Sequence, residues 1–158
     1  MASLARSVKG FTLIEAVLVV AVLTLVVGAT VPKFSAFSER YQVDNKSDEL
    51  TQLLRIARNK SMMSESDSPY GVHLVTGTAG SFTLFKGATY ATRDTSYDEE
   101  VHTLPNGITL GKTVAASDVV FTKVEGSTSN AGSITVALQG TTVTHTISVN
   151  SAGMVQLD

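Results

Sequence analysis

A single carboxylate, Glu15, stands inside an apolar run that covers residues 11–31 and holds no other charged side chain. A buried carboxylate needs a cationic partner, and the residues just before the run offer a way to make one. Cleavage of the chain between Gly10 and Phe11 would create a free α-amine on Phe11, four residues before Glu15. In a helix those positions are neighbours, and the two charges at ~4 Å attract by about 4 kcal/mol at an effective dielectric near 20. The same amine could instead meet Glu15 of a second helix packed alongside, which would fix the axial register between copies.

The element that must position Glu15 is the apolar run itself. A helix over residues 11–31 would be roughly 31 Å long, about the thickness of the hydrocarbon core of a bilayer. We therefore predict a transmembrane helix over residues 11–31 after a leader at residues 1–10. The only charges ahead of the run are Arg6 and Lys9. They predict a cytoplasmic N-terminus and a C-terminal region outside the membrane.

An ordinary secretory signal peptide is the alternative. Val27, Gly28 and Ala29 form a passable small-residue cleavage site after the apolar core. The chain would then be an exported or membrane-anchored β-domain that binds a ligand such as a glycan. This alternative leaves Glu15 unexplained, because a charge within the apolar stretch costs up to ~3 kcal/mol.

The heptapeptide KGFTLIE, Lys9 to Glu15, resembles the processing motif of type IV pilins and pseudopilins. The resemblance implies that a prepilin peptidase cuts after Gly10 and that the new amine of Phe11 is methylated. It also implies that Glu15 pairs with the amine of a neighbouring subunit during assembly. The chain would be a single-pass protein of the inner or cytoplasmic membrane with its head outside, assembled on a membrane platform into a type IV pilus or a type II secretion pseudopilus.

Gly28 and Pro32 predict a break in the helix. Proline has no N–H to donate to the carbonyl of Gly28, and glycine is a poor helix former. Two interpretations stay open: this segment unwinds in a filament, or Thr30 caps and Pro32 opens a separate second helix.

Residues 32–65 predict an amphipathic continuation of the helix, because apolar residues recur there at helical spacing. The polar patch from Asp44 to Ser47 would either kink this helix or recap it, and the sequence does not decide between them.

Residues 66–158 predict a β-rich head, because short alternating runs are separated by clusters of Gly, Ser, Thr and Asn. The expected strands are residues 70–75, 81–86, 88–92, 101–104, 108–114, 119–124, 133–138, 142–150 and 154–157. The fold class is α+β, with a long N-terminal helix packed on an antiparallel sheet.

The head resembles the H-type minor pseudopilins of type II secretion and the FimT-like minor pilins. The resemblance is carried by residues 54–58 (LRIAR), 72–74 (VHL), 104–108 (LPNGI), 121–126 and 153–155 (GMV). The sequence departs from this pattern at residues 61–63 (SMM), where an Ala-rich helix end is usual, and it lacks a basic C-terminal tail. It does not distinguish a major from a minor subunit, or a pilus from a secretion or competence system.

The sequence does not favour an enzyme. The histidines His73, His102 and His145 lack the paired spacing of a zinc site, so we expect structural roles, with His145 hydrogen-bonded and partly buried. No phosphate loop, nucleophile elbow or dinucleotide fingerprint is present, and the chain has no cysteine.

Charge argues against nucleic acid as a partner. Beyond Asn59 there are five lysines and arginines against nine aspartates and glutamates, a formal charge of −4. Four of these acids lie close together in a predicted loop: Asp94, Asp98, Glu99 and Glu100. Their spacing matches no EF-hand, so we expect a solvated loop rather than a calcium site and no cofactor.

Overall fold

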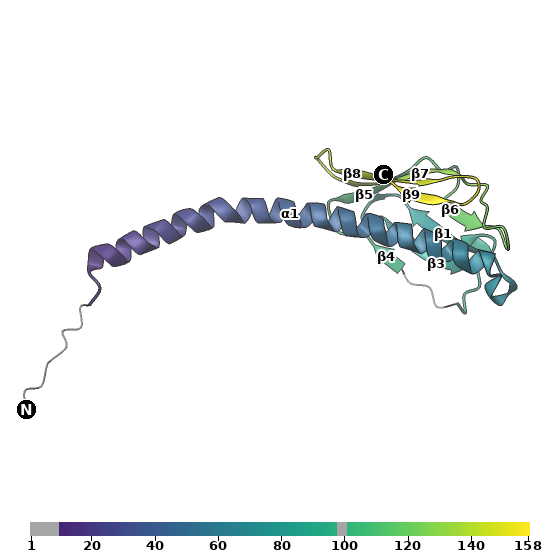
Figure 1. The fold of residues 1–158 in the computed structure, drawn as a ribbon, viewed down its shortest axis with the longest axis horizontal. Coiled ribbons are helices and arrows are strands. Elements are labelled where there is room, and N and C mark those ends of the chain that lie inside the picture. The colour runs from purple at the N-terminus through teal and green to yellow at the C-terminus, as the bar shows by residue number, and fades with distance from the viewer. Residues whose placement is uncertain (1–9, 98–100) are drawn as a thin grey trace, which may run out of the picture. The chain divides into compact units, whose positions relative to one another are not determined.

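A computed structural model describes residues 10–97 and 101–158, with residues 29–36 described in backbone only. The long helix α1 runs from Leu13 to Met62. Contacts between residues divide the chain into two compact units, with the boundary between Ser38 and Glu39. Figure 1 gives the order of the elements, and the two units are described separately below.

The N-terminal unit contains the first part of α1. Thr12 caps the helix, because its side-chain oxygen accepts a hydrogen bond from the backbone N–H of Glu15 at 3.3 Å. The large apolar side chains that follow are exposed, Leu13 by 84% and Leu25 by 74%. Within the described residues, no helix combines the length and the apolar character that a membrane span requires.

The predicted break at Gly28 and Pro32 is absent from this chain on its own. Helix α1 is continuous across both residues, so no second helix begins at Pro32. An interior proline removes one hydrogen bond, and the bonds of the turns on either side can hold the helix together. Unwinding of this segment in an assembled filament stays a prediction.

The polar patch from Asp44 to Ser47 neither ends nor restarts α1. The hydroxyl of Ser47 is buried and donates to the carbonyl of Val43, one turn earlier, at 2.8 Å. Lys46 reaches Glu49 at 2.6 Å on the same helix. These polar side chains therefore satisfy one another without interrupting the backbone.

The head consists of two antiparallel sheets. The first sheet has the strand order β4-β3-β1-β6, and the second has the order β2-β5-β7-β8-β9. The strands of the first sheet are β1 (Tyr70–Val75), β3 (Ser81–Lys86), β4 (Val101–Thr103) and β6 (Asp118–Phe121). Those of the second are β2 (Gly77–Thr78), β5 (Ile108–Lys112), β7 (Gly132–Leu138), β8 (Thr144–Val149) and β9 (Val155–Leu157).

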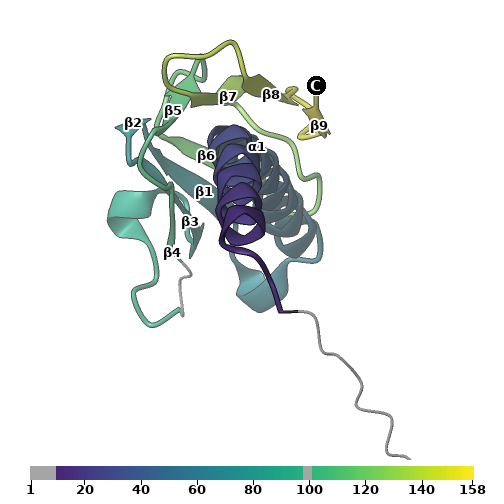
Figure 2. The ribbon, with the colours of Figure 1, turned by 90° about the vertical axis from the view of Figure 1, so that its left-hand side faces the viewer.

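The C-terminal part of α1 lies alongside both sheets, which flank it on different sides (Figures 1 and 2). One apolar core joins the three layers. It includes Leu50 and Leu54 of α1, Val72 of β1, Val136 of β7 and Ile147 of β8. The predicted α+β fold, a long helix on an antiparallel head, is confirmed.

The strands of the head differ from the predicted ones in several places: β2 (Gly77–Thr78) was not predicted, and β5 and β8 are shorter than expected. Residues 88–92 form no strand: Gly87, at φ +141°, ends β3, and a 3₁₀ helix (Tyr90–Thr92) follows, capped by the side chain of Thr89. The expected strand over residues 119–124 ends at Phe121, because the N–H of Thr122 donates to the carbonyl of Ser127 and so begins a turn. A further 3₁₀ helix (Glu65–Asp67) links α1 to β1.

Candidate processing and assembly site

The predicted cleavage point lies in exposed, non-helical chain. Gly10 and Phe11 precede the first residue of α1, and Phe11 is 83% exposed. A Cβ placed on Gly10 would meet no atom within 4 Å. Both residues that flank the predicted cleavage point are therefore exposed to solvent.

Glu15 lies in the first turn of α1. A carboxylate there is favoured by the positive end of the helix dipole. Within the described residues no cationic side chain pairs with it. Phe11 stands two residues ahead of the helix, so the helical stacking of Phe11 over Glu15 expected from the sequence is absent before cleavage. Cleavage must first create the amine of Phe11. The helix must also extend to Phe11 before that amine can stack on Glu15 of the same chain.

The three histidines each contact a carboxylate rather than one another. His73 Nδ1 lies 2.6 Å from Asp118 Oδ1 within the first sheet, and its ring stacks on Tyr90 at a centroid distance of 4.0 Å. His145 Nε2 of β8 lies 2.7 Å from Asp44 Oδ1 of α1. The hydrogen bond and partial burial predicted for His145 are confirmed.

His102 joins β4 to α1, with its Nδ1 2.5 Å from Glu49 Oε1. Burial alone would raise the pKa of Glu49, but the hydrogen bonds from Lys46 and His102 outweigh it and lower that pKa. With the pair of His145 and Asp44, helix α1 is thus tied by a histidine to a strand of each sheet. Among the residues that the structure describes, no three potential ligands lie close enough together to hold a metal ion.

Of the acidic loop, only Asp94 lies within the described residues; Asp98, Glu99 and Glu100 lie outside them. The carboxylate of Asp94 accepts the hydroxyl and the N–H of Ser96, at 2.6 Å and 3.0 Å, and an ammonium hydrogen of Lys86 at 2.9 Å. The hydroxyl of Ser96, then Lys86 and the N–H of Ser96, lower the pKa of Asp94 to about 2. The structure thus gives Asp94 partners of its own, and the absence of a calcium site stays a prediction.

Sequence reasoning missed the role of Ser61 at the C-terminal end of α1. Its hydroxyl is fully buried and accepts from the backbone N–H of Tyr70 at 2.8 Å, and it donates to the carbonyl of Tyr70 at 3.3 Å. Its own carbonyl accepts from the N–H of Val124 at 3.1 Å. The only signal in the sequence was the departure from an Ala-rich helix end.

A family model described as the prokaryotic N-terminal methylation motif matches residues 5–31. No protein of curated function matches the sequence. Among solved structures, the fold is similar to the type IV minor pilin FimU of Pseudomonas aeruginosa in two crystal forms. One form gives a TM-score of 0.59 at 18% identity over 77% of this chain and 92% of FimU, and the other gives 0.56 at 17% identity over 73% and 91%.

The minor pseudopilin EpsH from the type 2 secretion system of Vibrio cholerae is similar as well. Its TM-score is 0.59 at 14% identity, over 74% of this chain and 96% of EpsH. At these identities the likeness is one of fold. The resemblance to type IV pilins and H-type pseudopilins is confirmed in both of its parts: this chain joins a prokaryotic N-terminal methylation motif to the fold of a minor pilin or pseudopilin head.

Proposed function

We propose that the chain is a structural subunit of a type IV pilus or of a type II secretion pseudopilus. The observation that carries the proposal is the joining of two features in one chain, the methylation motif over residues 5–31 and a head with the minor pilin fold. Either feature alone would leave the function open, since a fold by itself hosts many functions.

In this proposal a prepilin peptidase cleaves the exposed bond after Gly10, and the amine of Phe11 is then methylated. Before assembly the apolar residues 11–31 hold the subunit in the inner or cytoplasmic membrane, with the head outside. The assembly platform then moves the subunit into the filament, where packing of the apolar helices supplies most of the cohesion. The exposed side chains of Leu13, Ile14 and Leu25 are the surface available for that packing.

Glu15 sets the register between neighbouring subunits. Because the helix begins at Leu13, the amine of Phe11 stands clear of the first turn and is free to reach the carboxylate of a neighbour. An ion pair formed in apolar surroundings neutralises both charges, whereas any other stagger leaves the carboxylate buried alone, at a cost of several kcal/mol. No catalytic activity is part of the proposal.

Mass spectrometry of the mature N-terminus tests the proposal. The chain is expressed in a host that carries a prepilin peptidase, and in the same host with the peptidase gene deleted. We expect a mature chain that begins with methylated Phe11 in the first host and an intact leader in the second. A mature chain that begins at Thr30, or that keeps its leader in both hosts, would overturn the proposal and favour the exported β-domain with an ordinary signal peptide.

A further inference from the structure

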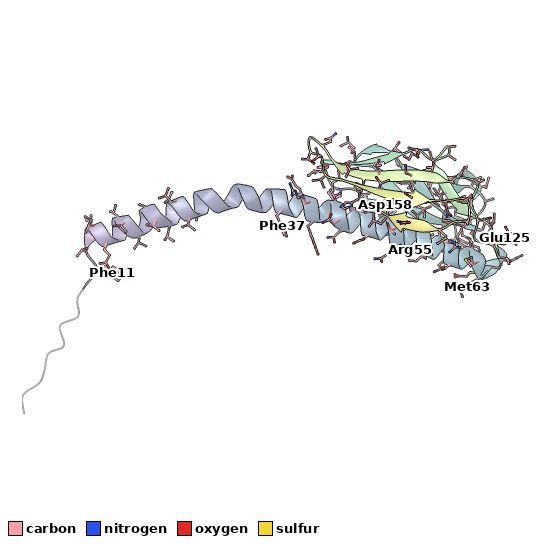
Figure 3. All side chains as sticks on the ribbon, turned by 45° about the horizontal axis from the view of Figure 1, so that its top comes forward. Phe11, Phe37, Arg55, Met63, Glu125 and Asp158 are labelled. Carbon is pink, nitrogen blue, oxygen red and sulfur yellow. The ribbon has the colours of Figure 1, made fainter. Side chains whose placement is uncertain are left out.

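Two arginines line a groove on the head between α1 and β9. The groove has a volume of about 240 Å³ and is lined by Arg55, Arg58, Asn59, Gly153, Met154 and Val155. Arg55 lies on α1 beside the C-terminal strand (Figure 3). The groove is far in sequence from the processing site, and none of the steps proposed above uses it.

Backbone carbonyls hold both guanidinium groups in place. Arg55 Nη2 donates to the carbonyl of Val155 at 3.2 Å. Arg58 donates through Nε to the carbonyl of Gly126 at 3.3 Å and through Nη2 to that of Ala152 at 3.4 Å. Each guanidinium has five N–H donors in a fixed plane. In the part of the chain that the structure describes, most of these donors make no hydrogen bond, and the three bonds above already orient both groups.

Two glycines make this arrangement possible. A Cβ on Gly153 would lie 1.8 Å from the carbonyl oxygen of Gly126, and a Cβ on Gly126 would lie 3.1 Å from Cγ of Arg58. Both glycines have positive φ, +74° and +65°. The loop that contains Gly126 thus packs directly against the backbone of the loop that contains Gly153, next to Arg58. This close packing supports one side of the groove.

Among the described residues, no acidic side chain forms an ion pair with either arginine of the groove. Four lysines of the second unit each pair with a carboxylate: Lys46 with Glu49, Lys60 with Glu65, Lys86 with Asp94 and Lys123 with Asp67. Within the described residues, Arg55 and Arg58 contact only carbonyl oxygens. In an acidic head, two adjacent fixed cations without an anion form a local positive site.

We infer that this groove receives a carboxylate side chain from a neighbouring protein subunit. A guanidinium binds a carboxylate through two parallel hydrogen bonds, and two fixed guanidinium groups define where that carboxylate must sit. Met154, which lines the groove, is 62% exposed, so an apolar residue next to the acid finds a surface to cover. Arginine and methionine are both enriched at protein interfaces. The inference rests on the proposed function only for the identity of the partner, another pilin-like subunit.

The same observations disfavour a nucleic acid as the occupant. A phosphate backbone is held by a row of free cations, whereas the lysines named above are already paired. The excess of acids beyond Asn59 repels a polyanion. A groove of this volume admits one side chain rather than a strand.

Two peptides that differ in one group test the inference on the full 158-residue chain in detergent micelles. They are acetyl-Leu-Glu-Leu-amide and acetyl-Leu-Gln-Leu-amide, and binding is followed by the ¹⁵N resonances of the arginine Nε–H groups. Arg55→Lys and Arg58→Lys each remove one Nε–H signal and so assign it. We expect the Glu peptide to shift both signals and to bind about tenfold more tightly than the Gln peptide, the effect of one charge-assisted pair. Arg58→Gln should abolish the difference, and Lys123→Gln, which removes a cation elsewhere on the head, should leave it unchanged.

The inference is overturned if neither peptide shifts the two signals, or if both bind equally well. It is also overturned if inorganic phosphate or a single-stranded oligonucleotide binds more tightly than the Glu peptide, since the site would then serve phosphate. The measurement uses the uncleaved chain, so its result does not depend on the mature N-terminus. Failure here and failure of the proposed function are therefore told apart.

Discussion

The hydroxyl of Ser61 holds the end of α1 to the start of the head, and its removal should weaken the head measurably. Ser61→Ala deletes the acceptor of the N–H of Tyr70 and a donor to the carbonyl of Tyr70, both in a fully buried setting. Loss of a buried partner costs about 1–3 kcal/mol. We expect the free energy of unfolding to fall by about 2 kcal/mol.

Ser47→Ala is the matched control. Ser47 is also a fully buried serine of α1, but its hydroxyl donates only to the carbonyl of Val43 in its own helix. That carbonyl keeps its place in the helical ladder when the hydroxyl is lost, and alanine is the better helix former. The free energy of unfolding should therefore change by no more than about 0.5 kcal/mol.

Urea denaturation of the chain in mild detergent micelles measures both variants, followed by near-ultraviolet circular dichroism. The chain has four tyrosines and no tryptophan, and all four tyrosines follow residue 39, so the signal comes from the head unit. With a slope near 2 kcal/mol per molar, the midpoint of Ser61→Ala should fall by about 1 M. Equal midpoints for the two variants would refute the reasoning, because the link from Ser61 to Tyr70 would then contribute nothing beyond an ordinary helix hydroxyl.

Further outcomes follow from other contacts. Glu15→Val should be cleaved normally yet enter filaments at least about tenfold less than the parent, from the ion-pair energy of several kcal/mol; normal incorporation, counted by immunoblot of sheared filaments, would contradict the register role. Because the pKa of Asp94 is depressed in the folded state, its contribution to stability is complete above its ordinary value of 3.8 and is lost as pH falls through about 2. Asp94→Asn should therefore reduce the fall of the melting temperature with pH at the acid end. An unchanged fall would count against the hydrogen bonds from Ser96 and Lys86. Calcium should give no heat in a calorimetric titration and leave the melting temperature unchanged, whereas saturable heat would reveal a site. Gly153→Ala should destabilise the head by at least about 2 kcal/mol, since its Cβ meets the carbonyl of Gly126 at 1.8 Å, while Gly140→Ala, at the same φ of +74° but in open space, should cost only about 1 kcal/mol; equal melting temperatures would refute the close packing.

The sequence predicted the head well where one face of a strand is buried. Strands β1 and β3 have the predicted bounds, and in β7 the alternating Ile134, Val136 and Leu138 are buried as expected. Periodicity identifies the buried face because it depends only on neighbours along the chain. It placed the end of α1 at residue 65, and the helix ends three residues earlier, at Met62.

Periodicity does not show which residues far apart in the sequence pair with each other. The pairs of Asp44 with His145 and of Glu49 with His102 join residues 101 and 53 positions apart. Nothing local in the sequence marks them, and the patch from Asp44 to Ser47 looked like a helix interruption for that reason. The division of the strands into two sheets depends on the same long-range pairings.

Local propensity misled at two places. Alternation across residues 88–92 resembled a strand, but Gly87 turns the chain and Thr89 caps a 3₁₀ turn instead. Gly28 and Pro32 marked a weak point of the helix, and the chain on its own keeps the helix intact there. At the candidate site, the sequence motif indicated Gly10, Phe11 and Glu15. On the head, the roles of Ser61 and of the arginine groove became visible only from the packing of loops against α1.

The contact between Arg55 and the carbonyl of Val155 spans 100 positions, and this has a consequence for biogenesis. During synthesis the helix emerges long before β8 and β9 exist, so the side of the helix that the second sheet covers stays incomplete until the final strands leave the ribosome. A chain that stops before residue 155 would leave β8 as an open sheet edge, free to pair with other molecules. Quality control of the new chain therefore has a simple cue, because only a chain that contains β9 covers the edge of β8.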